Sequence, residues 1–472
     1  MDTRIEEICK QVLEKIVPNS SEREKIQKLA DEVRDRVASE VDNVTLRAEV
    51  MVGGSVAKDT WLRDEADVDI FILFPTALSK ERLREVGLKV AKKALEGWRW
   101  RERYAEHPYL EAYVNGVRVN IVPCYKVEGG RWLSAADRTP FHTDYVKDKL
   151  RRRDLRDDIR LFKRFMKGIG VYGAEIRVGG FSGYLCELIV LNYQSFYQSL
   201  KAASEWRLGE VVDVENLYEG RLDEARRFFN APLIVIDPVD MNRNVAAAVS
   251  EERLGELIMA SKYFLEETRL SFFYPEEPIP LQVPMLREKL TRLGFDLVFV
   301  IFKGEETVPD VLWGQLYKSL RAVKGLLIQN DFNVLKAYAW SDENERNVLA
   351  FALESCLLPP SKRHMGPLID SREAVNFLAK HFGADSTAVG PWVEEKRWMV
   401  GVKRRYRSAV SLLQDKLREG GMDIGVAKRI AEGIRCSLKV LVNEEILDLY
   451  SSDKAFAAFL TDFLRGKPRW LR

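Results

Sequence analysis

The sequence predicts an α+β protein built from several domains. Its 472 residues provide material for about three domains of roughly 150 residues each. Segments with apolar residues at helical spacing alternate with short strand candidates rich in Val, Ile and Phe. Four prolines between residues 275 and 284 indicate a boundary. We therefore expect a head at 1–147, a mainly helical central domain at 148–274, and a C-terminal body and tail at 275–472.

The composition is that of a water-soluble globular protein. Apolar residues make up 46% of the chain and charged residues 31%, and no apolar run is long enough to cross a bilayer. The N-terminus lacks the apolar segment of a secretory signal, so we expect a cytoplasmic protein. Five scattered cysteines without a CxxC pair argue against a zinc ribbon or a disulfide framework. Only four histidines are present, so a catalytic metal should be oxygen-ligated Mg²⁺ or Mn²⁺.

The head should begin with helices and continue into a sheet. Residues 2–41 have helical spacing in two stretches, the second starting near Ser20 with Glu24 as a capping-box partner. A strand is expected at 44–52, a buried strand at 68–74 ended by Pro75, and a helix from Ser79 to about Trp98.

A hairpin should follow at residues 110–122. Asn115-Gly116 is a strong signal for a type I′ turn between two antiparallel strands. Arg118, Asn120 and Val122 then share one face of the second strand. That strand can lie beside the one that begins with Asp67 and Asp69.

The rest of the chain should be helical before the proline-rich boundary and mixed after it. Residues 148–171 and 185–230 have a helical, mixed-charge pattern. The later order is βαββαβ-like and resembles a ferredoxin-type or RRM-type module. We expect helices at 286–293, 310–329 and 371–380, strands at 297–302, 333–340 and 396–402, a strand or helix at 347–353, and helices over 404–464.

Residues 53–75, GGSVAKDTWLRDEADVDIFILFP, carry the clearest chemistry. Asp67 and Asp69 project from the same face of a strand because side chains alternate. They follow a Gly-Gly-Ser turn whose backbone N–H groups can cradle phosphate. Two carboxylates on a rigid edge can hold a pair of Mg²⁺ ions for phosphoryl or nucleotidyl transfer. The alternative is an ordinary Asp-x-Asp at the edge of a surface strand.

Basic residues are clustered although the net charge is only +2. Residues 147–167 contain ten Lys or Arg against four Asp, and 396–407, KRWMVGVKRRYR, contain six basic residues and no acid. Basic residues interleaved with aromatics suit phosphate contact and base stacking. A solvated helix face or tail is the alternative for each cluster.

Several ordered motifs together resemble the archaeal, class I CCA-adding enzymes. They are TWLRDEADVDIFILFP, YAEHPYLEAYVNGVRV, VPCYKV, SAADRTPFHTDYV, VYGAEIRVGGFSGYLCELIV, VIDPVDMNRNVAA and RHMGP, between residue 60 and about 367. The resemblance implies a polymerase-β-like nucleotidyltransferase head, a nucleotide-reading central domain, and an RRM- or ferredoxin-like tail with a mixed α/β body that grips tRNA. It also implies template-independent addition of C, C and A to tRNA from CTP and ATP, by a homodimer.

The resemblance also assigns residues. Asp67 and Asp69 would ligate two Mg²⁺ ions, and Arg243 would read the edge of the incoming C or A, held by Asp237 and Asp240. The alternatives are a packed core for the tyrosines, a cap for Ser55, and solvated charges for the lysines. The positions that match those around the incoming nucleotide are Gly54, Ser55, Lys58, His107, Arg138, Thr139, Lys163, Tyr172, Ser182, Tyr184 and Arg243.

Asn120 departs from the family pattern. The family has a third catalytic, metal-binding aspartate in V-x-V-D-x-V-P-C-Y, whereas this chain reads VRVNIVPCY. An amide keeps one oxygen but loses the charge and cannot accept the primer proton. Three explanations compete: an engineered Asp-to-Asn change, a natural weakened or repurposed homologue, and compensation by Glu111 on the partner strand. We favour the first, because the surrounding motif is intact.

The C-terminal part offers candidates for contact with the acceptor stem and TΨC arm of tRNA. They are Arg363, His364, Lys396, Arg397, Lys403, Arg404, Arg405 and Arg407. Such contact should depend on phosphates and shape, as A-form RNA allows. The alternatives to CCA addition are another enzyme of the same superfamily, such as a poly(A) polymerase, and a catalytically silent tRNA-binding protein.

Overall fold

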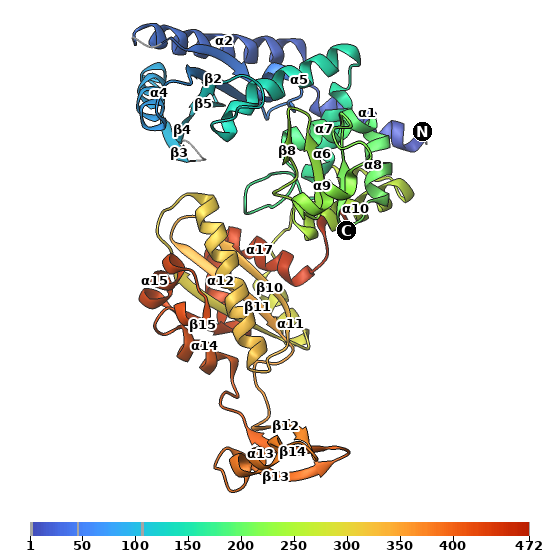
Figure 1. Ribbon diagram of the computed structural model, residues 1–472, viewed down its shortest axis with the longest axis vertical. Helices are drawn as coiled ribbons and strands as arrows, with labels where there is room; N and C mark the ends of the chain where they lie inside the picture. The colour runs from blue at the N-terminus through green and yellow to red at the C-terminus, as the bar shows by residue number, and fades with distance from the viewer. Residues whose placement is uncertain (1–2, 45–46, 105–107, 472) are drawn as a thin grey trace. The chain divides into compact units, whose positions relative to one another are not determined.

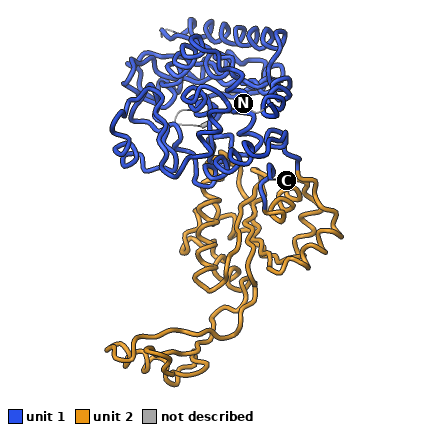
Figure 2. Tube along the Cα trace, turned by 90° about the vertical axis from the view of Figure 1, so that its right-hand side faces the viewer, with its two compact units in different colours: residues 1–277, 467–472 blue, residues 278–466 orange. Residues whose placement is uncertain are grey.

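The structure is a computed structural model that describes residues 3–44, 47–104 and 108–471. It forms two compact units, Met1–Glu277 with Lys467–Arg472, and Pro278–Gly466 (Figure 2). The first unit contains the predicted head and the helical region after it (Figure 1). No helix in the described part of the chain has the length and apolarity needed to cross a membrane.

The head is a five-stranded sheet in the order β1-β2-β5-β4-β3. Only β2 and β5 run parallel; the other neighbours are antiparallel. Helices α2 and α4 cover the face that carries Val68 and Ile70, and this face forms the core of the head (Figure 1). Asp67 and Asp69 therefore point to the opposite face. The elements are α1 (Thr3–Ile16), α2 (Ser20–Asp42), β1 (Glu49–Gly53), α3 (Gly54–Lys58), β2 (Asp67–Pro75), α4 (Lys80–Ala94), β3 (Trp100–Tyr104), β4 (Pro108–Val114) and β5 (Val117–Lys126).

Two local predictions in the head have different outcomes. The hairpin is confirmed: Asn115 and Gly116 have φ of 50° and 84°, as a type I′ turn requires. The predicted capping box, with Glu24 as the partner of a cap near Ser20-Ser21, is wrong. Helix α2 is capped by Asn19, which pairs reciprocally with Glu22, because the asparagine carbonyl reaches the first free backbone N–H groups.

The second half of unit 1 is mainly helical, with a small sheet that the sequence did not predict. This sheet has the order β6-β7-β8. Seven buried phenylalanines lie in the core of this half, and Trp470 from the chain end stacks on Phe272 at 5.5 Å. Helix α1 packs into the same core. The elements are η1 (Ala135–Arg138), α5 (Thr139–Arg152), α6 (Arg156–Gly168), α7 (Gly183–Tyr193), α8 (Phe196–Glu205), β6 (Glu210–Val212), α9 (Leu222–Phe229), β7 (Leu233–Asp237), β8 (Asp240–Asn244), α10 (Glu251–Glu266) and η2 (Leu270–Phe272).

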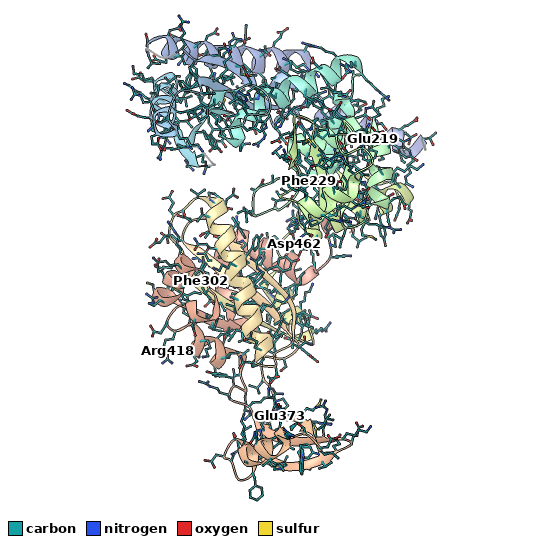
Figure 3. All side chains as sticks on the ribbon, viewed as in Figure 1. Glu219, Phe229, Phe302, Glu373, Arg418 and Asp462 are labelled. Carbon is teal, nitrogen blue, oxygen red and sulfur yellow. The ribbon has the colours of Figure 1, made fainter. Side chains whose placement is uncertain are left out.

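The second unit is built around an antiparallel sheet in the order β10-β11-β9-β15. Together with its helices this is the predicted ferredoxin-like βαββαβ module. Phe302 of β9, labelled in Figure 3, is buried in the core that β9 shares with α12 and α15. The elements of the module and its outer layer are α11 (Val283–Arg292), β9 (Asp296–Lys303), α12 (Pro309–Gln329), β10 (Val334–Ser341), β11 (Arg346–Leu353), α14 (Ala409–Leu417), η3 (Met422–Ile424), α15 (Lys428–Ser437), β15 (Lys439–Val442), η4 (Asn443–Ile446), α16 (Leu447–Ser452), α17 (Lys454–Arg465) and, within unit 1, η5 (Arg469–Leu471).

The last strand of this module is not the one predicted. The sequence assigned it to residues 396–402, but β15 closes the sheet after α15. Four residues are too few to show a period of two, so β15 was hidden within a segment read as helical. The predicted helix and strand exist but belong to a separate sheet in the order β12-β14-β13. That sheet comprises β12 (Ser361–Leu368), α13 (Glu373–His381), β13 (Thr387–Glu394) and β14 (Arg397–Lys403).

Candidate active site

Three polar side chains form a row across the face of the head sheet opposite α2 and α4. Asp69 on β2 is the direct neighbour of Asn120 on β5, and Asn120 is the direct neighbour of Glu111 on β4. Direct neighbours share a face, with Cβ atoms about 5 Å apart. The prediction that Asn120 lies beside the aspartates is therefore confirmed. Two residues earlier on the same two strands, Asp67 is the direct neighbour of Arg118.

Strand β5 supplies a hydrogen-bond donor to each aspartate. The amide Nδ2 of Asn120 donates to Asp69 Oδ1 at 2.9 Å. Arg118 Nε donates to Asp67 Oδ1 at 2.8 Å, and its Nη2 donates to Oδ2, which makes the pair bidentate. Burial raises the pKa of the Asp69 carboxyl, the Asn120 hydrogen bond opposes this, and the nearby charge of Asp67 adds to it.

The glycine turn lies against Asp69. Gly54 has φ of +66°, and a Cβ at this position would lie 2.0 Å from Asp69 Oδ2. Only glycine allows this conformation and this approach together. Ser55 follows in the single-turn helix α3, half-buried.

Asp67 and Asp69 offer the hard oxygen ligands that Mg²⁺ prefers. Asn120 can add a neutral carbonyl oxygen if its amide turns. The oxygen ligands that these side chains offer therefore suit a divalent ion, once Arg118 no longer binds Asp67. Within the described residues, no group of three or more His, Cys, Asp or Glu side chains is arranged to hold a metal ion.

Two lysines predicted to contact the triphosphate meet at one buried glutamate. Glu187 Oε2 lies 2.5 Å from Lys58 Nζ, and Glu187 Oε1 lies 2.8 Å from Lys163 Nζ. All three side chains are less than 10% exposed. Thr60 Oγ1 also donates to Glu187 Oε1, at 2.6 Å. We call Lys58, Lys163 and Glu187 the lysine cluster; it excludes the alternative that these lysines are solvated surface charges.

The charges of the lysine cluster are tightly coupled. Burial raises the pKa of Glu187, but Lys163 and Lys58 together lower it to about 2. Burial lowers the pKa of Lys163, and Glu187 opposes this. With two cations and one anion, the cluster has a net charge of +1 when all three groups are ionised. Glu187 was missed in the sequence because it lies inside the apolar run of α7.

Tyr172 and Ser182 lie at the start of α7, next to the lysine cluster. A Cβ added to Gly183 would lie 2.9 Å from Tyr172 Oη and 3.8 Å from Lys163 Nζ. The hydroxyl of Tyr172 and the amine of Lys163 therefore approach the same glycine. Burial raises the pKa of the Tyr172 hydroxyl. Ser182 caps α7, its Oγ accepting from the backbone N–H of Leu185 at 3.2 Å.

Asp237 joins three side chains around the predicted base-reading arginine. Arg243 Nη1 donates to Asp237 Oδ2 at 2.7 Å, and Tyr184 Oη donates to Oδ1 at 3.2 Å. His142 Nε2 lies 2.9 Å from the same Oδ2, and its ring stacks on Tyr184 at 4.1 Å. Asp237 is fully buried, whereas the Arg243 side chain is 37% exposed and can reach a ligand. His142 was not singled out in the sequence, although it lies in the quoted FHTDYV stretch.

The prediction that Asp237 and Asp240 both hold Arg243 is half wrong. Asp240 Oδ2 accepts instead from Arg138 Nε at 2.8 Å, because the turn between β7 and β8 points the two carboxylates to different neighbours. Arg138 also lies over the Trp132 ring at 5.4 Å. Thr139 begins α5. His107 lies outside the described residues.

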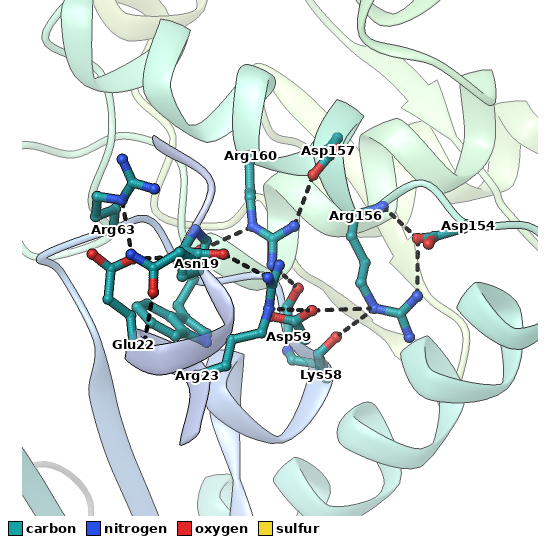
Figure 4. Close-up of polar contacts among 12 residues, drawn as sticks. Asn19, Glu22, Arg23, Lys58, Asp59, Arg63, Asp154, Arg156, Asp157 and Arg160 are labelled. Carbon is teal, nitrogen blue, oxygen red and sulfur yellow. Dashed lines mark hydrogen bonds and ion pairs between the residues drawn. The ribbon is translucent and has the colours of Figure 1, made fainter. Parts of the chain in front are cut away.

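A second ionic network, around Asp59, fixes the position of α3 (Figure 4). Asp59 ends α3 with φ of 51°. Arg160 of α6 donates through Nη2 to Asp59 Oδ1 at 2.7 Å and through Nε to the Trp61 carbonyl at 3.0 Å. Arg23 of α2 donates to Asp59 Oδ1 at 3.1 Å. Arg160 is almost fully buried, so this network holds the glycine turn against the helical half of unit 1.

The candidate RNA-binding residues fall into two groups. Arg363 and His364 on β12 pair with the neighbouring strand β14, which carries Arg397 and Lys403 and follows Lys396. Four of these residues lie in one small sheet, and Lys396 lies in the turn that leads into β14. Arg404 is less accessible: its side chain is only 14% exposed and pairs with Asp331, which also binds Lys362. Arg405 and Arg407 lie in the same short segment between β14 and α14.

Three family models match consecutive parts of the chain. The nucleotidyltransferase domain matches residues 26–149, the second domain of tRNA nucleotidyltransferase matches 157–274, and the C-terminal domain of CCA-adding enzyme matches 294–443. The three matches follow one another in sequence order from residue 26 to residue 443.

Curated relatives match over nearly the full length. A CCA-adding enzyme of Methanosarcina mazei is 35% identical over 464 residues, covering 97% of this chain and 98% of the relative. One of Methanothermobacter thermautotrophicus is 37% identical over 458 residues, covering 96% and 97%. A solved structure of a cytoplasmic RNA terminal U-transferase covers 58% of this chain at 14% identity with a TM-score of 0.45, a similarity too weak to bear on function.

Proposed function

Because this chain belongs to the CCA-adding enzymes, a family of tRNA nucleotidyltransferases, we propose that it adds C, C and A to the 3′ end of tRNA from CTP and ATP. The addition would proceed without a nucleic-acid template. One observation carries the proposal: the glycine turn and two aspartates of the head lie beside a buried pair of lysines, one of them from the helical half.

Asp67 and Asp69 are the ligands for Mg²⁺ in this proposal. A pair of Mg²⁺ ions held by these carboxylates would supply Lewis-acid activation of the tRNA 3′-hydroxyl and would neutralise charge on the triphosphate. Asp67 and Asp69 are held in position because both lie on the rigid strand β2. Gly54 keeps the turn close enough for its backbone N–H groups to face the same phosphates.

The lysine cluster is the proposed triphosphate contact. Its net positive charge is buried and already oriented by Glu187, so little side-chain freedom is lost when a triphosphate binds. Tyr172 can add a hydroxyl donor from the start of α7, and Ser55 another from α3. The triphosphate brings the negative charge that the cluster lacks.

Arg243 is the proposed reader of the incoming base. A guanidinium has five donors in a fixed plane, which suits the acceptor edge of cytosine and can also serve adenine. Asp237 accepts a hydrogen bond from one N–H group of the Arg243 guanidinium, and part of the Arg243 side chain remains exposed. His142 and Tyr184 also contact Asp237 and fix its position, so Arg243 is oriented before the nucleotide binds.

Asn120 lowers the rate of the reaction in this proposal. It donates a hydrogen bond to Asp69 and cannot accept the proton of the attacking hydroxyl. Glu111 stands next to it, but Arg103 Nη2 lies 2.9 Å from Glu111 Oε1 and holds that carboxylate. Compensation by Glu111 therefore requires that Arg103 release it. An engineered change and a natural weakened homologue remain the other two explanations.

The partner in this proposal is tRNA, bound by its acceptor stem and TΨC arm, and the assembly is a homodimer. The small sheet, with the turn that leads into β14, contributes Arg363, His364, Lys396, Arg397 and Lys403 to phosphate contact. Arg405 and Arg407 extend this basic surface beyond the end of β14.

Incubation with tRNA that lacks CCA tests the proposal. The chain and its Asn120→Asp variant would each receive labelled CTP alone, ATP alone, or both. We expect Asn120→Asp to incorporate two C residues with CTP alone and one further A when ATP is added. Tailing with ATP alone would indicate a poly(A) polymerase type of enzyme.

The second candidate is a catalytically silent tRNA-binding protein, which Asn120 itself favours. It predicts tRNA binding in a filter assay together with no incorporation, even by Asn120→Asp. That combination would overturn the enzymatic proposal and leave the tRNA partner in place.

A further inference from the structure

Both aspartates of the candidate metal site are already engaged by the neighbouring strand. Arg118 binds Asp67 through two N–H groups, and Asn120 binds Asp69 through one. The parallel register of β2 and β5 sets both pairs, because it places Arg118 opposite Asp67 and Asn120 opposite Asp69. The strand thus presents a cation and an amide to the two carboxylates.

This arrangement changes the charge that a metal ion would meet. Two carboxylates and one guanidinium give a net charge of −1 at this edge, and Asn120 adds none. A divalent ion is attracted to such a site less strongly than to the aspartates alone. It must also displace a guanidinium whose flat donor pair matches the Asp67 carboxylate.

The Arg118–Asp67 pair can be opened. The Arg118 side chain is 44% exposed and that of Asp67 is 34% exposed, so water reaches both partners. Exposed ion pairs contribute little to stability, and breaking one leaves each group solvated. The pair is therefore an obstacle to metal binding without being a permanent block.

We propose that Arg118 is a resident cation that competes with the divalent ion for Asp67 and weakens metal binding at this site. The inference rests on the proposed function only for the presence of a metal at Asp67 and Asp69. It adds a second reason, independent of Asn120, for a weakened site.

Direct metal binding tests the inference without any measurement of catalysis. Free Mn²⁺ can be followed by electron paramagnetic resonance during titration of the full chain, with neither nucleotide nor RNA present. We expect Arg118→Ala and Arg118→Gln each to tighten Mn²⁺ binding by about 3- to 10-fold, the scale of one exposed charge pair acting on a divalent ion. The Gln variant keeps most of the side chain and guards against a packing effect.

Lys126→Ala is the matched control. Lys126 lies on the same strand, and its ammonium pairs with Glu49 on β1, so its loss removes one positive charge and one exposed ion pair. Eight residues of strand, about 26 Å, separate it from Arg118. We expect no change in Mn²⁺ binding from this variant. An effect of Arg118→Ala no larger than that of Lys126→Ala, or weaker binding in both Arg118 variants, would overturn the inference.

The inference and the proposed function fail separately. Tightened Mn²⁺ binding in the Arg118 variants supports competition whether or not any variant incorporates CTP. CTP incorporation with unchanged Mn²⁺ binding in those variants supports the function and overturns the role of Arg118.

Discussion

The lysine cluster and the aspartate edge, by which we mean Asp67, Asp69, Arg118 and Asn120, are adjacent regions of one site. Their charged groups differ in burial and in pairing. In the lysine cluster, Glu187 binds two cations in a buried setting and all three groups are paired. At the aspartate edge, Asp67 and Arg118 are partly exposed, and the third position is a neutral amide. The first region is fixed before ligand arrives; the second can exchange partners. Substitutions should therefore damage folding in the lysine cluster and tune chemistry at the aspartate edge.

The largest effect should come from removing the charge of Glu187. Glu187→Gln leaves two buried lysines without a counter-ion, and breaking a buried pair costs about 3–5 kcal/mol. Urea unfolding followed by circular dichroism would measure the loss in the free energy of unfolding. The control is Glu219→Gln, at an exposed position labelled in Figure 3, where we expect a change within about 0.5 kcal/mol. Equal effects of the two variants would remove the distinction between the regions.

The stability supplied by Glu187 should depend on pH in a defined window. Its pKa is lowered from 4.5 to about 2 in the folded chain, so the unfolded chain binds this proton more readily. The contribution is therefore fully present above pH 4.5 and is lost as the pH falls toward 2. Unfolding midpoints measured between pH 6 and pH 3 should fall less steeply for Glu187→Gln than for the unchanged chain. Parallel curves would contradict this assignment.

A smaller and metal-dependent effect is expected at the aspartate edge. Asn120→Asp loses the hydrogen bond to Asp69 and places two carboxylates side by side, so its free energy of unfolding should fall by about 1 kcal/mol without metal. Added Mg²⁺ should restore the stability of the variant more than that of the unchanged chain. Thermal unfolding with EDTA and with Mg²⁺ would measure both values. Identical Mg²⁺ responses in the two proteins would show that position 120 does not face the metal.

A change at a helix cap outside the site should have a similarly small effect, and this effect should not respond to metal. Asn19→Ala removes the capping box of α2 and should cost about 1 kcal/mol in the free energy of unfolding, independent of metal. It provides a reference for a local change that touches neither region. A dependence of its effect on Mg²⁺ would mean that α2 communicates with the aspartate edge.

The sequence predicted the features that depend on local spacing. Alternation placed Asp67 and Asp69 on one face, and the Asn115-Gly116 turn set the hairpin register that places Asn120 opposite Glu111. The lysine cluster depends instead on contacts across 129 residues, which no local pattern reports. Glu187 looked like an interruption in an apolar helix, although the fold makes it the shared partner of two lysines. The same limit hid β15, which pairs with β9 far away in the chain.

Single-turnover CTP incorporation, measured on tRNA lacking CCA for the unchanged chain and for Asn120→Asp, tests the central claim most directly. In the proposed function, CTP affinity depends mainly on the lysine cluster and the rate depends on the aspartate edge. We expect CTP affinities within about twofold and a rate that rises at least about tenfold in the variant, equivalent to roughly 1.4 kcal/mol of barrier. An unchanged rate, or a large change in CTP affinity with no gain in rate, would contradict the division of roles between the two regions.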